Sequence, residues 1–452
     1  MANRGKPPTK RPLRQPFLSV LATLTLSFLM TCPARAAGLY QDGAGARAMG
    51  MGGTGTAVAA DPLDTLFNNP AALGQIDRLT AQLGVHAGVA MGDFHNRVND
   101  DSTMTAAGVI GQGAIALPLG PVHLALGVNP DIAARTGWRY ADAPGGADGH
   151  TTYGVRPNDA EILLLRTALG ASVQLHRTLS VGANVGLLYN QNLLRTPYVF
   201  QSQPTLRTAK TLLDLETDGF GWNAQVGVRW QPIDPLTFSV SYTSRSRIET
   251  DGRATGNART QFNNLGLGAA RSDFAYDAEV TNIFPQQLSA GLAWNVNHRF
   301  TLSAQFDWIN WSDAFEKLPV HLTHGNNTDL NGVLGSSRLD DTVPLRWSDQ
   351  YVGRLGVEQK LGEHWTVRGG YAYGNNPIPD HTLTPLNAAI TEHLLTAGVG
   401  YRVGHVKIDA AYQWQVPATA RIRRSDVAPA EYGDSVISVN VQQFNLTLGY
   451  EF

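Results

Sequence analysis

The last ten residues of the chain, QFNLTLGYEF (residues 443–452), decide the fold because apolar and polar side chains alternate through them without a break. A repeat of two is that of a β-strand with one apolar and one polar face. Aromatic residues at the end of such a strand are typical of the girdle of a transmembrane barrel. The segment therefore predicts a final strand with one face against lipid.

The same alternation recurs upstream, for example over residues 287–296, 300–308 and 395–403. We predict about fourteen strands, starting near residues 78, 104, 120, 160, 178, 218, 235, 284, 299, 346, 363, 391, 405 and 436. An even number suits a closed antiparallel barrel, which leaves no sheet edge in lipid. The fold class is therefore all-β, a 14-stranded antiparallel transmembrane β-barrel.

The connections between these strands alternate in length. Those at 297–298 and 404–405 are short, whereas the one at 312–344 is long. Short turns on one side and long loops on the other are typical of an outer-membrane barrel. We expect the Asn/Gly/Ala-rich region 251–283 to be an extracellular loop.

The composition excludes several classes of protein. Only 16% of the residues are charged, where a soluble domain averages about 25%. A helical membrane protein is excluded because no run reaches the roughly 18 apolar residues that a spanning helix needs. With 35 basic against 37 acidic residues, the basic excess of a nucleic-acid-binding protein is missing. The sequence contains neither H-E-x-x-H nor G-x-S-x-G, so we predict no catalytic residues and no metal site.

The N-terminus has the form of a secretory signal peptide, residues 1–36. Five basic residues precede the apolar stretch 17–31, and Ala34-Arg35-Ala36 supplies an A-x-A cleavage site. A lipoprotein signal ending at Cys32, the one cysteine of the chain, is the competing interpretation. Either signal implies export, and with the barrel it predicts the outer membrane of a Gram-negative bacterium.

Residues 37–77, ahead of the barrel at 78–452, form a separate small unit. Leu63, Leu66, Phe67 and Leu73 have helix-like spacing and few charges surround them. We expect this unit to be a hatch inside the lumen, with a periplasmic tail as the alternative. Its Gly50-x-Gly52-x-x-Gly55 matches a dinucleotide-binding pattern, but no strand precedes it, so we expect no cofactor.

Taken in order, several motifs resemble the FadL/TodX family of outer-membrane transporters of long-chain fatty acids and hydrophobic hydrocarbons. They are residues 37–48, Asn69-Pro70-Ala71, Gly219–Asn223, Asp307-Trp308-x-Asn310-Trp311-Ser312, Trp347-x-Asp349-x-Tyr351 and Pro377-Ile378-Pro379-Asp380. The resemblance implies a fourteen-stranded barrel closed by an N-terminal hatch. It also implies capture of hydrophobic substrate at an extracellular groove, transfer to an inner pocket, and lateral release through a kinked strand once the hatch moves.

On this resemblance Asn69, Pro70 and Ala71 set the contact of the hatch with the barrel wall. Pro377, Pro379 and Asp380 cannot continue a central strand, so we expect them in a loop at the extracellular mouth. A buried carboxylate needs a cation, and Arg195, just past the fifth strand, and Arg346 are the candidates for a fatty acid. Tyr198, Phe200 and Leu206 are candidates for the groove, from their local apolarity.

The function predicted is transport of hydrophobic compounds, with long-chain fatty acids as cargo. Neutral aromatic or alkane hydrocarbons are the alternative cargo, and a general porin or a barrel enzyme such as a lipase is the alternative from another class. The expected partners are the hydrophobic ligand, outer-membrane lipid and lipopolysaccharide, and the barrel-assembly machinery during biogenesis. We expect a monomer that binds no nucleic acid.

Overall fold

A computed structural model describes residues 39–267 and 272–452. The predicted signal peptide and Cys32 lie outside the described residues. The sheet contains eighteen strand elements: β1 Thr80–Asn96, β2 Asn99–Leu119, β3 Val122–Ala141, β4 Val155–His176, β5 Leu179–Val199, β6 Lys210–Ile233, β7 Leu236–Thr243, β8 Ser246–Asn257, β9 Asp273–Phe284, β10 Gln287–Asn295, β11 Phe300–Ile309, β12 Lys317–Thr323, β13 Leu339–Pro344, β14 Gln350–Leu361, β15 Trp365–Gly374, β16 His393–Val403, β17 Val406–Ile422 and β18 Ser435–Glu451.

These elements make a closed antiparallel barrel of fourteen strands. Four barrel strands are interrupted, and each appears as a pair of elements: β7/β8, β9/β10, β11/β12 and β13/β14. For example, β6 pairs with both β7 and β8. Likewise, β11 pairs with β14, and β12 pairs with β13. The first strand closes the barrel on the last, from Thr80 opposite Glu451 to His95 opposite Val436. The predicted fold is confirmed, down to the strand that ends the chain.

The wall has its polar side chains inside and its apolar side chains outside. On β18, Phe444, Leu446 and Leu448 are more than half exposed, whereas Gln443 and Asn445 are buried. This pattern is the reverse of a soluble protein and is the one that a lipid-facing barrel needs. Within the described residues, no helix has the length and apolarity to cross a membrane.

The expectation of a loop over 251–283 is wrong for most of that region. β8 continues to Asn257 and β9 starts at Asp273, and the two strands pair from Ser246 opposite Phe284 to Asn257 opposite Asp273. Only the tip carries a helix, α3 Arg259–Asn264. The long connection after residue 312 likewise holds strands β12 and β13. Outside the membrane a strand has no lipid-facing side, so the alternation that marks it in the sequence weakens.

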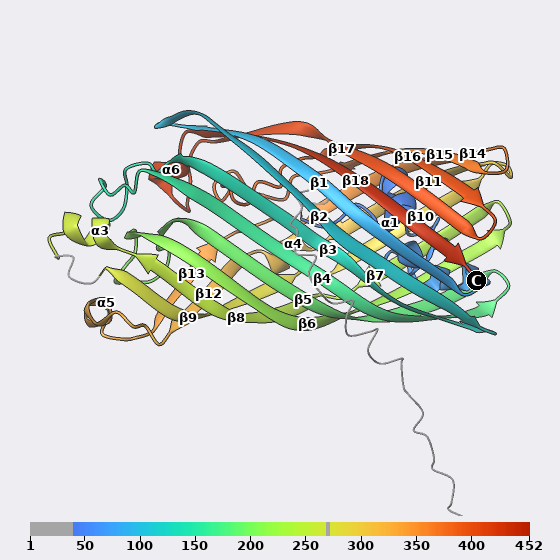
Figure 1. Ribbon diagram of the computed structural model, residues 1–452, viewed down its shortest axis with the longest axis horizontal. Helices are drawn as coiled ribbons and strands as arrows, with labels where there is room; N and C mark the ends of the chain where they lie inside the picture. Colours follow the sequence, from blue (N-terminus) through green and yellow to red (C-terminus); the bar gives the residue numbers. More distant parts are fainter. Residues whose placement is uncertain (1–38, 268–271) are drawn as a thin grey trace, which may run out of the picture.

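The N-terminal segment, residues 39–79, lies within the barrel near the end where the hairpin turns are short (Figure 1). It carries α1 Gly45–Gly50, α2 Pro62–Phe67 and the 3₁₀ helix η1 Pro70–Gln75. Helix α1 contacts β15 to β18, α2 contacts β1 to β4, and η1 contacts β3 to β6. At the opposite end lie the short helices α5 Thr328–Leu334 and α6 Pro429–Tyr432, whereas α4 Trp311–Ala314 lies near the middle of the barrel (Figure 1).

Candidate functional site

Two apolar cavities lie between the N-terminal segment and the far end of the barrel. The outer cavity, about 780 Å³, is lined by the ends of β5, β6, β8, β9, β12 and β13 and includes Tyr198, Phe200 and Leu206. The inner cavity, about 1160 Å³, is lined by Leu39, Met104, Trp138 and Trp347 among others. Leu194, Leu215 and Leu318 line both cavities, so the two share a wall and form one apolar path.

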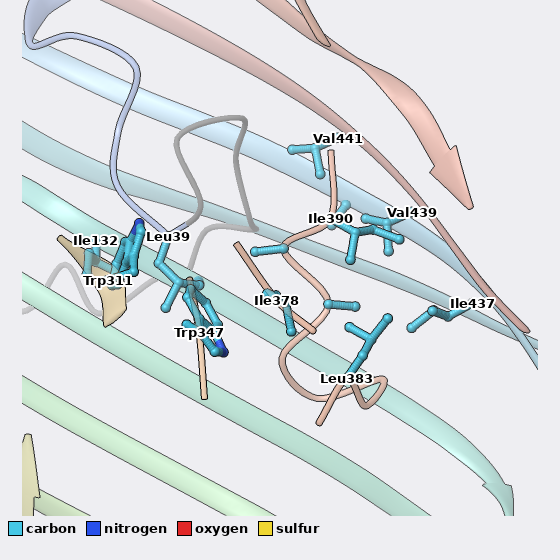
Figure 2. Packing of buried hydrophobic residues seen from close by; sticks show 14 of the residues in the cluster. Leu39, Ile132, Trp311, Trp347, Ile378, Leu383, Ile390, Ile437, Val439 and Val441 are labelled. Atoms are coloured by element: carbon cyan, nitrogen blue, oxygen red, sulfur yellow. The ribbon is translucent and has the colours of Figure 1, made fainter. Parts of the chain in front are cut away.

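The inner cavity is built around the N-terminal residues and a loop that folds inward. Figure 2 shows Leu39 beside Trp347 and Trp311, with Ile378, Leu383 and Ile390 of the loop before β16 on the other side. Tyr40 packs on Trp311 with ring centroids 5.4 Å apart. The interruption of β11 at α4 and of β13 before β14 turns Trp311 and Trp347 inward. These breaks therefore place Trp347 on the lining of the cavity and pack Trp311 behind it, with ring centroids 5.1 Å apart.

Each apolar cavity offers a few neutral polar groups, among them the hydroxyls of Thr136 in the inner cavity and Thr211 in the outer one, which have no hydrogen-bond partner among the described residues. In the inner cavity the indole Nε1 of Trp347 has no hydrogen-bond partner among the described residues, and in the outer cavity the same holds for the hydroxyl of Tyr276. Both side chains are buried. A ligand with a hydrogen-bond acceptor could satisfy either group, although the rest of the lining selects for apolar surface.

The barrel wall has a gap beside the inner cavity. Strands β2 and β3 pair only from Gly113 opposite Val128 down to Leu119 opposite Val122, although both continue for more than ten residues beyond. Pro130 lacks the N–H that a ladder needs, and β3 shifts register against β4 between Pro130 and Ile132. Ladder bonds are not normally given up in lipid because unpaired backbone groups there are costly. The gap is therefore a built feature.

The gap leads from the inner cavity to an apolar exterior. Met104 on β2 and Ala134 on β3 line the cavity where the two strands are unpaired. On the outside of the unpaired part of β2, Ala107 and Val109 lie opposite Val89 and Ala87 of β1. A side chain bridge closes only the far end of the gap, where the Asn99 amide donates to the carbonyl of Ala141 at 2.8 Å.

The N-terminal residues touch the bend in β3. The backbone N–H of Gln41 donates to the carbonyl of Asp131 at 3.0 Å, and the Asp131 carboxylate pairs with Arg166 at 3.2 Å. Leu39 lies in the inner cavity two residues earlier. Residues 39–42 thus connect the cavity, the bend and the gap.

Asn69 fixes the N-terminal segment to the wall. Its side chain is fully buried, donates to the carbonyls of Thr56 at 3.0 Å and Val228 at 3.4 Å, and accepts from the N–H of Ala71 at 3.1 Å. The following Pro70 starts η1, where its missing N–H costs nothing. Ala71 accepts at its carbonyl from the Ser180 hydroxyl of β5 at 2.9 Å.

Two chains of buried ion pairs tie the same segment to the strands. In the first, Arg47 pairs with Glu358 at 2.9 Å, and Glu358 also accepts from Arg368 at 2.7 Å. The chain continues from Arg368 through Asp409 to Lys407, whose ammonium pairs with Asp61 at 2.6 Å. Removing one member would leave the others charged in a buried place, which is strongly unfavourable.

The second chain is shorter and lies nearer the N-terminus. Arg354 on β14 donates to Asp42 at 2.7 Å and to Asp307 at 2.6 Å. All three side chains are almost completely buried.

One carboxylate of the segment takes no part in these chains. Asp64 is 1% exposed, and neither of its oxygens has a hydrogen-bond partner in the part of the chain that the structure describes. Burial, and then the charge of Asp61, raise the pKa of Asp64 to about 8. At neutral pH this carboxyl is therefore largely protonated, and α2 docks without burying an unpaired charge.

The two arginines predicted to hold a carboxylate lie outside both cavities. Arg195 is not past the fifth strand, as expected, but within β5, where it pairs with Asp214 at 2.9 Å with a side chain 47% exposed. Arg346 lies between β13 and β14 and pairs with Asp426 at 2.9 Å with a side chain 50% exposed. The structure does not bring the two together or place either on a cavity lining.

The loop with Pro377, Pro379 and Asp380 connects β15 to β16. Pro377 is buried and accepts at its carbonyl from the N–H of Ser348 at 2.8 Å, whereas Asp380 is exposed. The loop turns into the lumen, and its later residues Pro385, Leu386, Ala388 and Ala389 line the inner cavity.

Sequence reasoning missed the ion chains and Arg135. Arg354, Glu358, Arg368 and Asp409 stand at positions that alternate with exposed apolar residues on their strands. Charges on the lumen face were thus visible, but their partners in residues 42–61 were not. Arg135 lines the inner cavity and lies opposite Glu161 across β3 and β4.

The pattern Gly50-x-Gly52-x-x-Gly55, for which we expected no cofactor, has a packing role. A Cβ on Gly52 would lie 2.8 Å from the carbonyl oxygen of Leu355, and one on Gly55 would lie 2.3 Å from the Asn68 amide. Gly52 also has φ +71°, a conformation that favours glycine. Among the described residues, no group of acidic, His or Cys side chains could hold a metal ion.

The chain belongs to the family of outer membrane protein transport proteins (OMPP1/FadL/TodX), which matches residues 27–452. The predicted family is thus confirmed, together with an outer-membrane location. The family members and the similar structures are transporters and channels, not enzymes.

Curated relatives with significant similarity are long-chain fatty acid transport proteins of Escherichia coli. The protein of strain K12 is 24% identical over 171 residues, which are 36% of this chain and 33% of the relative. The chain thus matches about a third of that relative's length. The protein of strain CFT073 is 21% identical over 386 residues, 78% of this chain and 80% of the relative.

Two solved structures share the fold. A Pseudomonas aeruginosa FadL homologue has a TM-score of 0.73 at 19% identity, with 92% of this chain and all of that one covered. The Pseudomonas putida toluene transporter TodX gives a TM-score of 0.73 at 19% identity and the same coverage.

Proposed function

We propose that this protein carries hydrophobic compounds across the outer membrane of a Gram-negative bacterium, with neutral hydrocarbons as its main cargo. The observation that carries the proposal is the apolar path from the outer cavity to the inner one and on to the gap between β2 and β3. An apolar solute gains about 0.8 kcal/mol for each buried CH₂, so this path spares it any passage through water.

In this proposal the N-terminal segment is a hatch and the gap is the exit. The ion chains and Asn69 hold the hatch across the lumen, which leaves the gap as the route of lower polarity. Residues 39–42 contact both the inner cavity and the bend at Asp131. Movement of these residues would let a ligand leave the inner cavity sideways into the outer leaflet.

The placement of the arginines supports neutral cargo. Arg195 and Arg346 each already pair with a carboxylate and stand clear of the cavities. Arg135, the arginine on the lining of the inner cavity, lies opposite Glu161. A ligand carboxylate would have to compete with Glu161 for this cation, and losing that contest would leave a buried charge unpaired.

A long-chain fatty acid remains the second candidate because Arg135 does reach the inner cavity. The curated relatives named as long-chain fatty acid transport proteins favour the same cargo. In this version Arg135 would release Glu161 and take the ligand carboxylate.

Uptake by cells that lack their own transporter of this family tests the proposal. Labelled toluene and labelled oleate would be compared for the wild type, for Ala134→Trp, which fills the inner cavity at the gap, and for Arg135→Leu. Ala183→Trp, on the lipid side of β5, is the matched control. We expect the wild type to take up toluene and Ala134→Trp to lower this uptake at least tenfold. Arg135→Leu and Ala183→Trp should leave toluene uptake unchanged. Oleate uptake that falls in Arg135→Leu would establish the fatty-acid candidate, and failure of both solutes to enter would refute the transport proposal.

A further inference from the structure

A third cavity, here called the polar chamber, lies on the other side of residues 39–43 from the inner cavity. Its volume is about 750 Å³. Amides and hydroxyls dominate its lining, which includes Gln41, Asn68, Asn129 and Asn223 together with the guanidinium of Arg166. The apolar path described above does not use it. Its lining therefore calls for an explanation of its own.

The polar chamber contains buried polar side chains with unsatisfied atoms. Asn129, Arg166 and Asn223 are 3%, 4% and 5% exposed. Among the described residues, the Oδ1 atoms of both asparagines have no hydrogen-bond partner, and neither do the two amide atoms of Gln41, whereas the Nε of Arg166 faces Asp131 at 3.2 Å. Buried polar groups are normally hydrogen-bonded, so the chamber suits an occupant that bonds to these atoms.

The unsatisfied atoms include both donors and acceptors. Gln41 supplies one of each, and the asparagine Oδ1 atoms accept. A hydroxyl group, which donates and accepts at once, meets such a mixture better than a carboxylate, which only accepts.

The charges around the polar chamber cancel. Its charged lining groups are Asp131, Arg166, Asp307 and Arg354, and they form the ion pairs Arg166–Asp131 and Arg354–Asp307. Arg354 also pairs with Asp42. Because each guanidinium on the lining already pairs with a carboxylate, an anionic ligand would have to compete with that carboxylate for the cation.

The polar chamber and the inner cavity are separated by very little chain. At the N-terminus Leu39 lines the inner cavity, while Tyr40 and Gln41 line the chamber. On β3, Asn129 and Asp131 line the chamber and Ala134 lines the inner cavity. A strand rises about 3.3 Å per residue, so the two spaces lie within one substrate length of each other.

We infer that the polar chamber is a head-group site for neutral, hydroxyl-bearing amphiphiles whose apolar part occupies the inner cavity. This inference rests on the proposed function and extends its neutral cargo from hydrocarbons to compounds that carry a hydroxyl group. The hydroxyl bonds to Asn129, Asn223 and Gln41, while the alkyl or aryl part stays among Trp138 and Trp347. Displacement of residues 39–43 joins the two spaces.

Binding of tritiated dodecanol, dodecane and dodecanoate to the full protein in lipid nanodiscs tests the inference. Binding is measured as the excess over nanodiscs without protein, for the wild type and the double variant Asn129→Leu/Asn223→Leu. Asn445→Leu is the matched control, because Asn445 is a buried lumen asparagine that accepts from Gln112 at 3.1 Å and does not line the chamber. Barrel folding of each variant is checked by its heat-dependent shift on a denaturing gel.

We expect the double variant to bind dodecanol about tenfold more weakly, as the loss of one to two hydrogen bonds of about 1 kcal/mol each implies, and to bind dodecane as the wild type does. Asn445→Leu should change neither. Dodecanoate at pH 8 should bind the wild type more weakly than dodecanol. If dodecane binds but dodecanol binding does not respond to the double variant, the chamber holds water only and the inference is overturned while the proposed function stands. Tighter binding of dodecanoate than of dodecanol also overturns it. If no ligand binds the wild type, the proposed function itself fails.

Discussion

Replacing Asn69 by alanine should release the N-terminal segment while the barrel stays folded. The substitution removes three hydrogen bonds, to Thr56, Val228 and Ala71, and each such bond contributes about 1 kcal/mol net. The bond to Val228 joins the segment to the wall, while those to Thr56 and Ala71 lie within the segment. The loss of free energy against local opening of the segment is therefore about 3 kcal/mol, of which docking to the wall accounts for about 1 kcal/mol, and the total is roughly a 100-fold change in the opening equilibrium.

Hydrogen exchange followed by mass spectrometry in nanodiscs measures this effect directly. Peptides that cover α2 and η1 should exchange roughly 100-fold faster in Asn69→Ala, since local opening controls exchange of protected amides. Strand peptides should be unchanged, and conductance in a planar bilayer should rise as the lumen opens. Asn264→Ala is the matched control, because Asn264 also bonds through its side chain, to Asp148 and Thr151, but is exposed in α3, at the end of the barrel away from the N-terminal segment.

Two results would refute this reasoning. If the amides of η1 exchange less than about threefold faster, Asn69 does not hold the segment. If all strand peptides lose protection equally, the residue stabilises the whole barrel and has no separate role in docking. In either case the α2 and η1 peptides of Asn264→Ala have to exchange at the wild-type rate.

Three further changes test other parts of the structure. Asp64→Asn should abolish a pH dependence of docking. Because the pKa of Asp64 is raised, its contribution to docking stability is fully present below about pH 4 and is lost as the pH rises through about 8. After correction for intrinsic exchange, wild-type α2 amides should therefore exchange faster at pH 9 than at pH 6, and those of the variant should not. Gly227→Ala would place a Cβ 2.0 Å from Asn69 Oδ1 and should raise conductance in planar bilayers; unchanged conductance would show that the wall adapts. Leu215→Trp, in the wall shared by both apolar cavities, should lower toluene uptake at least tenfold without raising conductance, and unimpaired uptake would exclude the path through that wall.

The sequence predicted best the part of the chain that contacts lipid. The predicted starts near 178, 299 and 405 lie within one residue of β5, β11 and β17. Lipid on one side and a polar lumen on the other impose strict alternation there, so the pattern is legible residue by residue. The C-terminal strand carries the clearest case.

The errors concern strands that continue beyond the membrane. We expected starts near 104 and 218, but β2 starts at Asn99 and β6 at Lys210. The additional residues of β6 include Thr211 and Thr217, which are buried and polar. Without lipid outside them these residues lack an apolar face, and only their pairing with β5 and β8 makes them strands.

The site was less predictable than the fold because its parts meet from distant positions. Asp61 and Lys407 are 346 residues apart in the chain, and neither stands in a motif. The gap leaves a weak local signal, Pro130 inside an otherwise regular strand. That proline could have located the bend, but nothing in the sequence shows that β2 parts from β3 beside it.

The distribution of charge inside the barrel supports a sideways exit over a straight one. Below the inner cavity a ligand would meet the ion pairs of Arg354 and Arg47, and it would have to separate charges that are almost completely buried. Separating a buried pair costs about 3–5 kcal/mol. Passage between Met104 on β2 and Ala134 on β3 breaks no hydrogen bond between these strands, because they pair only from Gly113 to Leu119 of β2. An apolar molecule gains nothing from the ion pairs that would offset their loss. The N-terminal segment need not leave the lumen for transport in this proposal, because displacement of residues 39–43 alone opens the way from the inner cavity to the gap.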